Sequence, residues 1–385
     1  MNWSPTRMNP VPPLIAVEGD YRSMGEQIGV RTADMIARSV ETYSERFRSQ
    51  ARLDDETIDR WGLTYYDLAQ QYDPDIAAML DGMAAGSGQP LSRIVALNAR
   101  TELLYGTGYR DEGCTSLAVL PSHTDNGHTL LAQNWDWHPE QAEVTFLLAT
   151  RDPSGFTVLS LTEAGMLAKS GLNSAGLGVC ANLLVSDRDA GGEGVPYHFL
   201  LRGALQSTTM AKAHQRLLPV RRISSGNVLI ADASGGEAID FELAPDVFGT
   251  LLPDSGLLAH ANHFLADLPL TDLKAATSAL TQLRPTRVRH LLAPAIAQHN
   301  VSTTDVVRVL RDEWSYPDGI CRYPDPQAPT ADQVSTVYSI VMDLTARTLW
   351  IAPGPPSKHP YTRWELDAPF GSPAAAAAHD FAPED

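Results

Sequence analysis

The feature that most constrains this chain is an abrupt change of pattern at the Gly113–Cys114 bond. Before the bond, apolar residues recur at helix-like spacing with charges between them, as from Tyr21 to about Phe47. After it come short apolar or alternating runs, including TSLAVLP, HTLLAQNWDW and AEVTFLLAT, which turn-forming residues separate. The pattern predicts an all-helical leader followed by an antiparallel sheet built of sequential hairpins.

In the rest of the chain, helices and strands are again expected in separate groups. Two helices are expected at Tyr197–Gln206 and Met210–Leu217, then strands in NVLIADA, EAIDFELA and VFGTLLP. Helices are expected again near Thr286–Gln298 and Thr303–Trp314, before a last hairpin of TVYSIVMDL with RTLWIAPG. Strands and helices in separate blocks favour an α+β fold in which two sheets pack together with helices outside, not a βαβ repeat.

Composition excludes several classes of partner. Lys and Arg number 29 against 46 Asp and Glu, a formal net charge of −17, which argues against nucleic acid and anionic membranes as partners. The N-terminal stretch lacks the pattern of a secretory signal, and no run approaches about 18 apolar residues, so we expect a cytoplasmic protein. Three cysteines do not make a disulfide framework.

Cys114 stands out because a glycine-rich polar loop, GTGYRDEG, leads directly into it. Gly113 lacks a Cβ, so the backbone there tolerates unusual geometry and the thiol can approach the Gly113 carbonyl. Attack would give a thioester that water hydrolyses, leaving Cys114 as a new N-terminus. The unperturbed pKa of an α-amine is about 7.7–8.0 against about 8.5 for a thiol, so the amine can serve as base for its own thiol.

Six segments, in order, carry a resemblance to a known family: DEGCTSLAVL, LAQNWDW, LTEAG with GLNSAGLGV, GVPYHFLLRGALQST, HANH and SYPDGICRY. The chain resembles the acyl-coenzyme A:6-aminopenicillanate acyltransferase (isopenicillin N acyltransferase-like) family, peptidase family C45, of the N-terminal nucleophile (Ntn) hydrolases. The resemblance spans about residues 14–367. Acid ceramidase-like amidases also begin a catalytic chain with Cys-Thr-Ser, but the HANH and QNWDW contexts are more similar to the acyltransferase family.

The resemblance implies roles for four residues at the centre of the site. Cys114 matches the nucleophile, and Gly113 matches the residue before the cut. Asp136, in QNWDW, matches a carboxylate that orients the α-amine and holds its charge. Asn262, in HANH, matches the side chain that hydrogen-bonds the oxyanion of the tetrahedral intermediate.

Two further residues are implied to contact substrate. Ser116 matches a hydroxyl residue near the site, and its spacing along a strand places it on the same face as Cys114. Arg322 matches an arginine associated with the active site, where a guanidinium could pair with a substrate carboxylate.

The resemblance also implies a four-layer αββα sandwich made from two fragments that stay associated after the cut. Residues 1–113 form the helical α fragment and 114–367 the β fragment, and 368–385 are expected to be a disordered tail. The sequence leaves the oligomeric state undetermined, a homo-oligomer included.

The expected activity is hydrolysis of a linear N-acyl amide through an acyl-thioester on Cys114, with no cofactor. The first alternative is an acyltransferase that moves an acyl group from acyl-coenzyme A or an N-acyl donor to an amine such as a 6-aminopenicillanate-like acceptor. The second is a binding protein of the same fold that never matures.

Rival chemistries find weaker support in the sequence. His260 and His263 form an H-x-x-H pair, yet no H-E-x-x-H and no cysteine pair of zinc spacing occurs, so no metal site is expected. The segment Leu172–Gly176 lacks the first glycine of a serine-hydrolase elbow.

Overall fold

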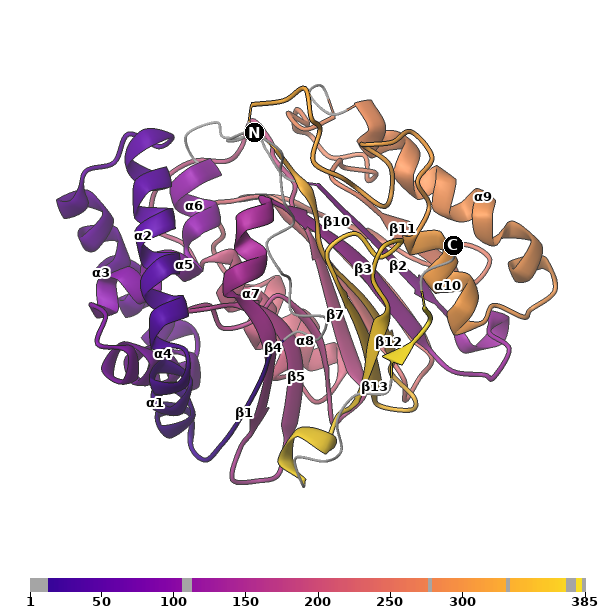
Figure 1. Cartoon of the computed structure of the whole chain (residues 1–385). Coiled ribbons are helices and arrows are strands. Elements are labelled where there is room, and N and C mark those ends of the chain that lie inside the picture. Colours follow the sequence, from indigo (N-terminus) through magenta and orange to yellow (C-terminus); the bar gives the residue numbers. More distant parts are fainter. Residues whose placement is uncertain (1–12, 106–112, 276–278, 330–332, 372–378, 383–385) are drawn as a thin grey trace.

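The computed structural model describes residues 13–105, 113–275, 279–329, 333–371 and 379–382. Within these residues two β-sheets stack face to face between two helical layers (Figure 1). The N-terminal helices cover the outer face of one sheet, and two later helices cover the outer face of the other. The predicted α+β fold, a four-layer αββα sandwich with helices on both outer faces, is confirmed.

The helices before the Gly113–Cys114 bond begin at side-chain caps in several places. The carboxylates of Asp20 and Asp54 accept backbone N–H groups of the first turns of α1 and α3, which satisfies donors that have no partner inside the helix. The helices of this part are α1 (Tyr21–Arg31), α2 (Ala33–Ser49), α3 (Asp55–Tyr72), α4 (Pro74–Ser87), α5 (Leu91–Asn98) and α6 (Arg100–Tyr105). The later ones are α7 (Tyr197–Leu205), α8 (Met210–Leu217), α9 (Leu283–Ala297) and α10 (Thr303–Leu310).

Glycines inside α4 serve packing rather than helix termination. A Cβ on Gly82 would lie 2.1 Å from the carbonyl oxygen of Arg22, and one on Gly86 would lie 2.2 Å from that of Glu26. These glycines therefore let α4 lie directly against the backbone of α1. The helix ends only at Gly88, whose φ of 70° is the left-handed conformation that favours glycine.

One sheet has eight strands in the order β1-β4-β5-β6-β7-β8-β9-β10, antiparallel except for the parallel β1–β4 pair. Its strands are β1 (Leu14–Glu18), β4 (Thr145–Arg151), β5 (Thr157–Glu163), β6 (Ser170–Asn173), β7 (Leu177–Asn182), β8 (Gly226–Asp232), β9 (Glu237–Leu243) and β10 (Phe248–Leu251). The expectation of an all-helical leader is wrong at β1, since the short apolar run LIAVE pairs with β4 and extends the sheet of the other fragment.

The second sheet has the order β11-β2-β3-β12-β13-β14-β15. Its strands are β11 (Leu257–His260), β2 (Gly113–Val119), β3 (Leu130–Trp137), β12 (Ser335–Asp343), β13 (Thr348–Pro353), β14 (Tyr361–Glu365) and β15 (His379–Asp380). The expected disordered tail, 368–385, is partly ordered, because β15 pairs with β14 and the ring of Phe381 packs against Tyr361. Residues 372–378 and 383–385 of that tail lie outside the described residues.

Alternation along β2 divides its side chains between two cores. Cys114 and Ala118 belong to the large core that fills the space between the sheets and beneath the N-terminal helices. Leu117 and Val119 belong to the smaller core between the second sheet and helices α9 and α10. Successive strand residues point to opposite faces, so β2 presents the thiol toward the first sheet, in the interior of the sandwich.

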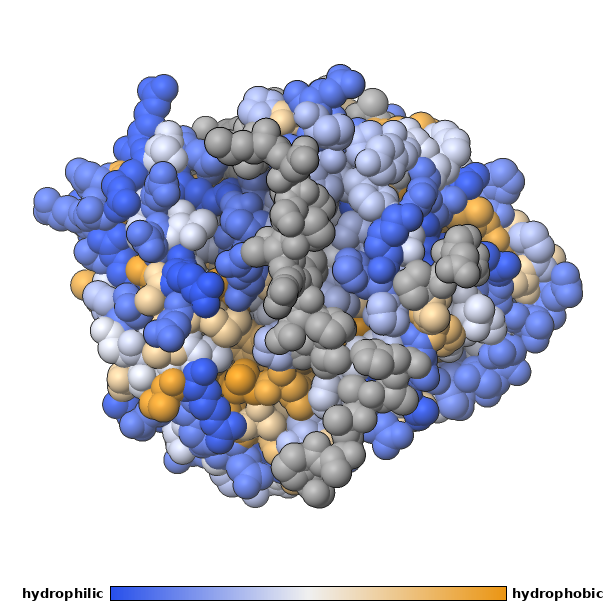
Figure 2. Space-filling model, in the orientation of Figure 1, coloured by the Kyte–Doolittle hydropathy of each residue, from blue (hydrophilic) through white to orange (hydrophobic). Residues whose placement is uncertain are grey.

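Apart from the grey segments, the face in Figure 2 is mostly hydrophilic, with a group of apolar residues below its centre. Among the described helices, none combines the length and apolar character that a bilayer crossing needs.

Candidate active site

Strand pairing places the predicted residues around one peptide bond. In the β2–β3 register Gly113 lies opposite Asp136, and Cys114 lies opposite Trp135. On the other side β11 pairs with β2 from Ser116 to Val119 and then delivers Asn262 two residues beyond its end. The structure thus brings together Gly113, Cys114, Asp136 and Asn262, which are far apart in sequence. The thiol residue itself is only 2% exposed.

Asp136 carries a carboxylate that is fully buried and half satisfied. Its Oδ1 accepts a hydrogen bond of 2.7 Å from the hydroxyl of Thr336, while no described residue donates to its Oδ2. Burial raises the pKa of Asp136, against the opposing influence of Arg322 and Arg284. The unsatisfied oxygen lies beside Gly113, where a Cβ would be 3.2 Å from it. A buried acceptor in this position suits a donor created at Cys114 by cleavage.

Asn262 contacts Cys114 directly. Its Oδ1 accepts the backbone N–H of Cys114 at 2.7 Å, and its Nδ2 donates to the carbonyl of Leu183 at 3.0 Å. The backbone N–H of Asn262 is itself held by the hydroxyl of Thr281 at 2.8 Å. An amide nitrogen carries two N–H groups, and for the second one the described residues provide no acceptor.

Arg284, at the start of α9, is a site residue that the sequence interpretation missed. Its guanidinium donates to the Cys114 carbonyl, to the Thr115 hydroxyl at 2.9 Å and to Asn262 Oδ1 at 2.8 Å. Burial lowers the pKa of Arg284 to about 10, so the group stays charged near neutral pH. Because Arg284 and the Cys114 amide both donate to Oδ1, they fix which way the Asn262 amide points. No local signal marks this arginine among the three in LRPTRVR.

Arg322 lies on the Gly113 side of the thiol. Its guanidinium ion-pairs with Asp318 at 2.9 Å, and a Cβ built on Gly113 would lie 2.5 Å from Arg322 Nη1. Gly113 itself is part of strand β2. Here the reason for glycine is space beside Arg322 and Asp136, not an unusual backbone conformation.

Gly113→Ala is therefore expected to slow self-cleavage by about 10²-fold, the cost of a displacement of order 1 Å in a reacting group. The added methyl group pushes Arg322 and Asp136 away from the bond that is cut. The rate is measured by following the uncut chain on denaturing gels. Gly191→Ala, in a loop where a Cβ meets nothing within 4 Å and no left-handed φ is required, is the matched control. Equal rates for the Gly113 and Gly191 variants would contradict this explanation.

Ser116 shares the interior-facing side of β2 but is bound to the opposite sheet. Its hydroxyl donates to Asn182 Oδ1 at 2.7 Å, and the side chain is fully buried. Neither Ser116 nor Arg322 is among the described residues that line the cavity at the thiol. Their predicted contact with substrate stays a prediction.

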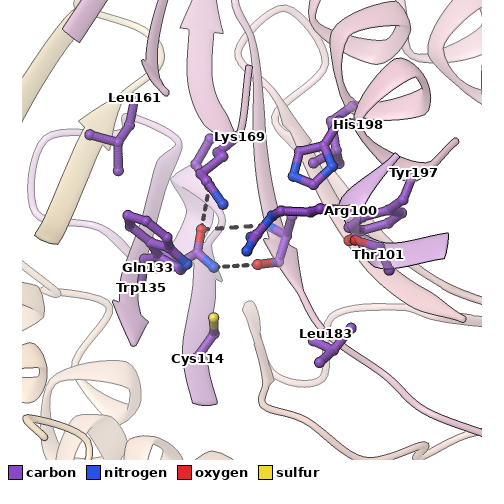
Figure 3. Close-up of a pocket in the computed structure, with 13 residues that line it drawn as sticks. Arg100, Thr101, Cys114, Gln133, Trp135, Leu161, Lys169, Leu183, Tyr197 and His198 are labelled. Carbon is purple, nitrogen blue, oxygen red and sulfur yellow. Dashed lines mark hydrogen bonds between the residues drawn. The ribbon is translucent and has the colours of Figure 1, made fainter. Parts of the chain in front are cut away.

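A cavity opens at Cys114 between the two sheets (Figure 3). Its volume is about 30 Å³, which holds only a few water molecules, so the site must widen to admit an acyl group. Two of its wall residues, Arg100 and Thr101, come from α6, on the N-terminal side of Gly113. The lining residues are Arg100, Thr101, Cys114, Gln133, Trp135, Leu161, Lys169, Ser170, Ala181, Leu183, Tyr197, His198 and Leu201.

Glu102, also on α6, links the cavity wall to the N-terminal helices. Its carboxylate accepts the backbone N–H of Tyr197 at 2.8 Å and the hydroxyl of Ser224 at 2.7 Å. Burial raises the pKa of Glu102 to about 7. The folded protein therefore binds this proton more tightly than the unfolded chain, and the stability it contributes at low pH is lost as pH rises from about 4.5 to about 7.

As pH rises from about 4.5 to about 7, the free energy of unfolding of the wild-type protein should fall by up to about 3 kcal/mol relative to that of Glu102→Gln. The variant shows no such fall because glutamine has no proton to release. Denaturant unfolding of both proteins below and above the range measures the difference. Glu45→Gln, at an exposed position of α2, is the control. A difference between wild type and Glu102→Gln that does not vary with pH would refute the prediction.

Comparisons with known proteins identify the family of this chain. The family model of acyl-coenzyme A:6-aminopenicillanic acid acyl-transferase matches residues 122–358, more than half of the chain. The chain belongs to this acyl-transferase family. A relative from Emericella nidulans, the acyl-coenzyme A:6-aminopenicillanic-acid-acyltransferase 40 kDa form, is 26% identical over 345 residues, which cover 89% of this chain and 93% of the relative. The resemblance found in the sequence is thereby confirmed.

Solved structures similar to this acyl-transferase family member are more distant. The conjugated bile acid hydrolase of Clostridium perfringens is 16% identical with a TM-score of 0.45, covering 66% of this chain and 92% of that one. An N-acylethanolamine-hydrolyzing acid amidase ortholog of Caenorhabditis elegans is 15% identical with a TM-score of 0.45, covering 60% and 93%. The penicillin V acylase of Agrobacterium tumefaciens is 15% identical with a TM-score of 0.42, covering 62% and 83%.

Proposed function

We propose that this protein is a self-cleaving N-terminal cysteine amidase that hydrolyses a linear N-acyl amide. The observation that carries the proposal is the arrangement at one bond. A buried thiol, an amide side chain on the thiol residue's own N–H and a half-satisfied carboxylate all meet at Gly113–Cys114. Membership of the acyl-transferase family supports acyl chemistry in this protein.

Maturation would proceed by an N-to-S shift. The sulfur of Cys114 attacks the Gly113 carbonyl carbon, the C–N bond breaks, and the thiol proton passes to the departing amine. Water then hydrolyses the thioester and leaves Gly113 as a carboxylate. Arg284, which donates to the Cys114 carbonyl, holds the strand residue in place during the attack.

In the mature protein the new α-amine would stay between two acceptors. Asn262 Oδ1 already accepts the N–H of Cys114. Asp136 Oδ2, which accepts no hydrogen bond from the described residues and ion-pairs with Arg284 at 4.0 Å, lies on the Gly113 side. The amine can then take the thiol proton and return it to the leaving amine of the substrate. The second N–H of Asn262 Nδ2 would donate to the oxyanion of the tetrahedral intermediate.

Acyl transfer is the second candidate, favoured by the names of the matching family and of the Emericella relative. The two activities share the acyl-thioester and differ in whether water or an amine resolves it. The third hypothesis is a binding protein of the same fold that does not cleave itself.

The test is to mix matured protein with N-acyl amides or acyl-coenzyme A and measure the intact mass of the β fragment. The proposal requires one added acyl group, located on Cys114 by peptide mapping. Free acid as the product indicates the hydrolase, and a new amide formed with added amines indicates the transferase. A chain that remains uncut and takes up no acyl group would overturn both and favour the binding protein.

A further inference from the structure

The HANH motif, residues 260–263, carries Asn262 between two histidines that the proposed function does not use. His260 is the last residue of β11 and lies opposite Ser116 of β2. Its ring nitrogen Nδ1 lies 2.8 Å from the carbonyl oxygen of Ala261. That carbonyl belongs to the same peptide group as the N–H of Asn262. His260 therefore contacts the peptide group from which the Asn262 residue extends.

Both ring nitrogens of His260 face oxygen atoms. A carbonyl oxygen can only accept a hydrogen bond, so Nδ1 carries a proton toward Ala261. Nε2 lies 2.7 Å from Oε1 of Glu242, a fully buried carboxylate of β9. Glu242 also accepts the backbone N–H groups of Leu265 at 2.6 Å and Ala266 at 2.8 Å, which leaves the shared proton on Nε2 rather than on the carboxylate. His260 is therefore an imidazolium that donates from both nitrogens.

The charged groups around His260 agree with this assignment. Burial acts to lower the pKa of His260, but Asp240 and Glu242 raise it above its ordinary value. Asp240 is also on β9, and burial raises its own pKa to about 6, so it is ionised near neutral pH. The ring of His263 lies 6.3 Å from that of His260. Burial, with the charges of His260 and Arg284, lowers the pKa of His263 to about 4, so the motif contains one charged and one neutral histidine.

The neutral His263 contacts the other end of the same peptide group through Thr281. The N–H of Asn262 donates to the hydroxyl of Thr281 at 2.8 Å, and that hydroxyl oxygen lies 3.2 Å from Nδ1 of His263. The hydroxyl accepts from Asn262 and can donate its own proton to the unprotonated Nδ1. The peptide group is therefore fixed at its carbonyl by His260 and at its N–H by Thr281 and His263.

We propose that the two histidines of the motif, His260 charged and His263 neutral, are positioning residues for the Asn262 side chain. This inference rests on the proposed function, because it assumes that Asn262 donates to the oxyanion at Cys114. The fixed peptide group sets where the Asn262 side chain begins, and the hydrogen bonds from Cys114 and Arg284 then hold its amide oxygen. A buried ion pair contributes little net stability on average, so its place beneath this motif suits orientation more than stability.

A double-mutant cycle tests whether His260 acts through Asn262. His260→Gln should lower kcat per matured chain by about tenfold with KM unchanged, because a misplaced Asn262 donates less well to the transition state. In the Asn262→Ala background the same substitution should change kcat by less than about twofold. Glu242→Gln, which keeps the size of the side chain but not its charge, should show the same dependence. Product formation from an N-acyl amide measures all of these proteins.

The control is His290→Gln, at an exposed position of α9, which should leave kcat unchanged. A loss of about tenfold from His260→Gln in both backgrounds would overturn the proposal, because the histidine would then act independently of Asn262. An unchanged kcat in the His260→Gln protein would overturn it as well.

The second test needs neither turnover nor a folded variant. Nitrogen NMR of the histidine rings in the wild-type protein is recorded at pH about 7.5, one unit above the ordinary pKa of histidine. We expect two protonated ring nitrogens in His260 and one in His263. A neutral His260 or a charged His263 would overturn the proposal, because the contacts on which it rests need these opposite states.

Hydrogen exchange separates this inference from the amidase proposal. If the matured protein cleaves no amide, the amidase proposal fails, and exchange at the Asn262 N–H still decides whether the motif is held as described. The exchange should be faster in the His260→Gln protein than in the His290→Gln protein, because the peptide group loses the contact at its carbonyl. Equal exchange rates in the two variants would overturn the positioning function.

Discussion

Replacing Cys114 with alanine should leave one uncut chain of 385 residues and abolish turnover. The alanine has no sulfur to attack the Gly113 carbonyl, and without that attack no α-amine forms to act as the base. Removal of a catalytic nucleophile costs about 10⁶-fold in kcat, which in practice means no detectable activity. Denaturing electrophoresis and intact mass measure the cleavage, and product formation from an acyl donor measures the activity.

Cys321→Ala is the matched control for this variant. Cys321 is equally buried, and burial raises the pKa of its thiol to about 11, so it has no thiolate to offer near neutral pH. That variant should mature into fragments 1–113 and 114–385. Two fragments from the Cys114→Ala protein would show that another agent cuts the chain, and the proposal of self-cleavage would fail.

Asn262→Ala should lower kcat by about 10²–10³-fold while the protein remains folded, as for other oxyanion donors. The variant removes both the acceptor on the Cys114 nitrogen and the amide donor for the oxyanion. The contact with the Cys114 nitrogen can also affect self-cleavage. The extent of cleavage is therefore measured first, and kcat is expressed per matured chain.

Asn262→Asp separates the two functions of this side chain. It keeps an oxygen for the Cys114 nitrogen and for Arg284 but exchanges the donating Nδ2 for a second oxygen. If oxyanion donation is what matters, the aspartate variant loses at least as much kcat as the alanine variant. A near-normal kcat in either protein would exclude Asn262 from that role.

Much of the fold could be predicted from the sequence, because its pattern changes where the architecture changes. The runs after Cys114 alternate as sheet strands do, and the expected helices at Tyr197–Gln206 and Met210–Leu217 match α7 and α8. Strand β1 was missed because five residues, LIAVE, show no clear alternation, and their partner β4 lies more than a hundred residues away. Parallel pairing over such a distance leaves no local signal.

Site residues could be predicted only where a sequence pattern or a family motif identifies them. Gly113–Cys114 stands at a change of pattern, and the resemblance supplied Asp136 and Asn262 as candidates, which the structure brings to the same bond. Arg284 has no such signal. It is an ordinary basic residue in sequence, and only the three-dimensional packing of α9 against the strands buries it beside the thiol.

Strand β1 has a practical bearing on how the protein is handled. It protects the backbone groups of β4, which would otherwise form the outermost strand of the eight-stranded sheet. A protein trimmed beyond Glu18 would offer those N–H and C=O groups to other molecules, an arrangement that promotes aggregation. Affinity tags and truncations should therefore stop short of Leu14, and poor solubility of a shortened N-terminus would reflect an uncovered sheet edge rather than a failure of the catalytic chemistry.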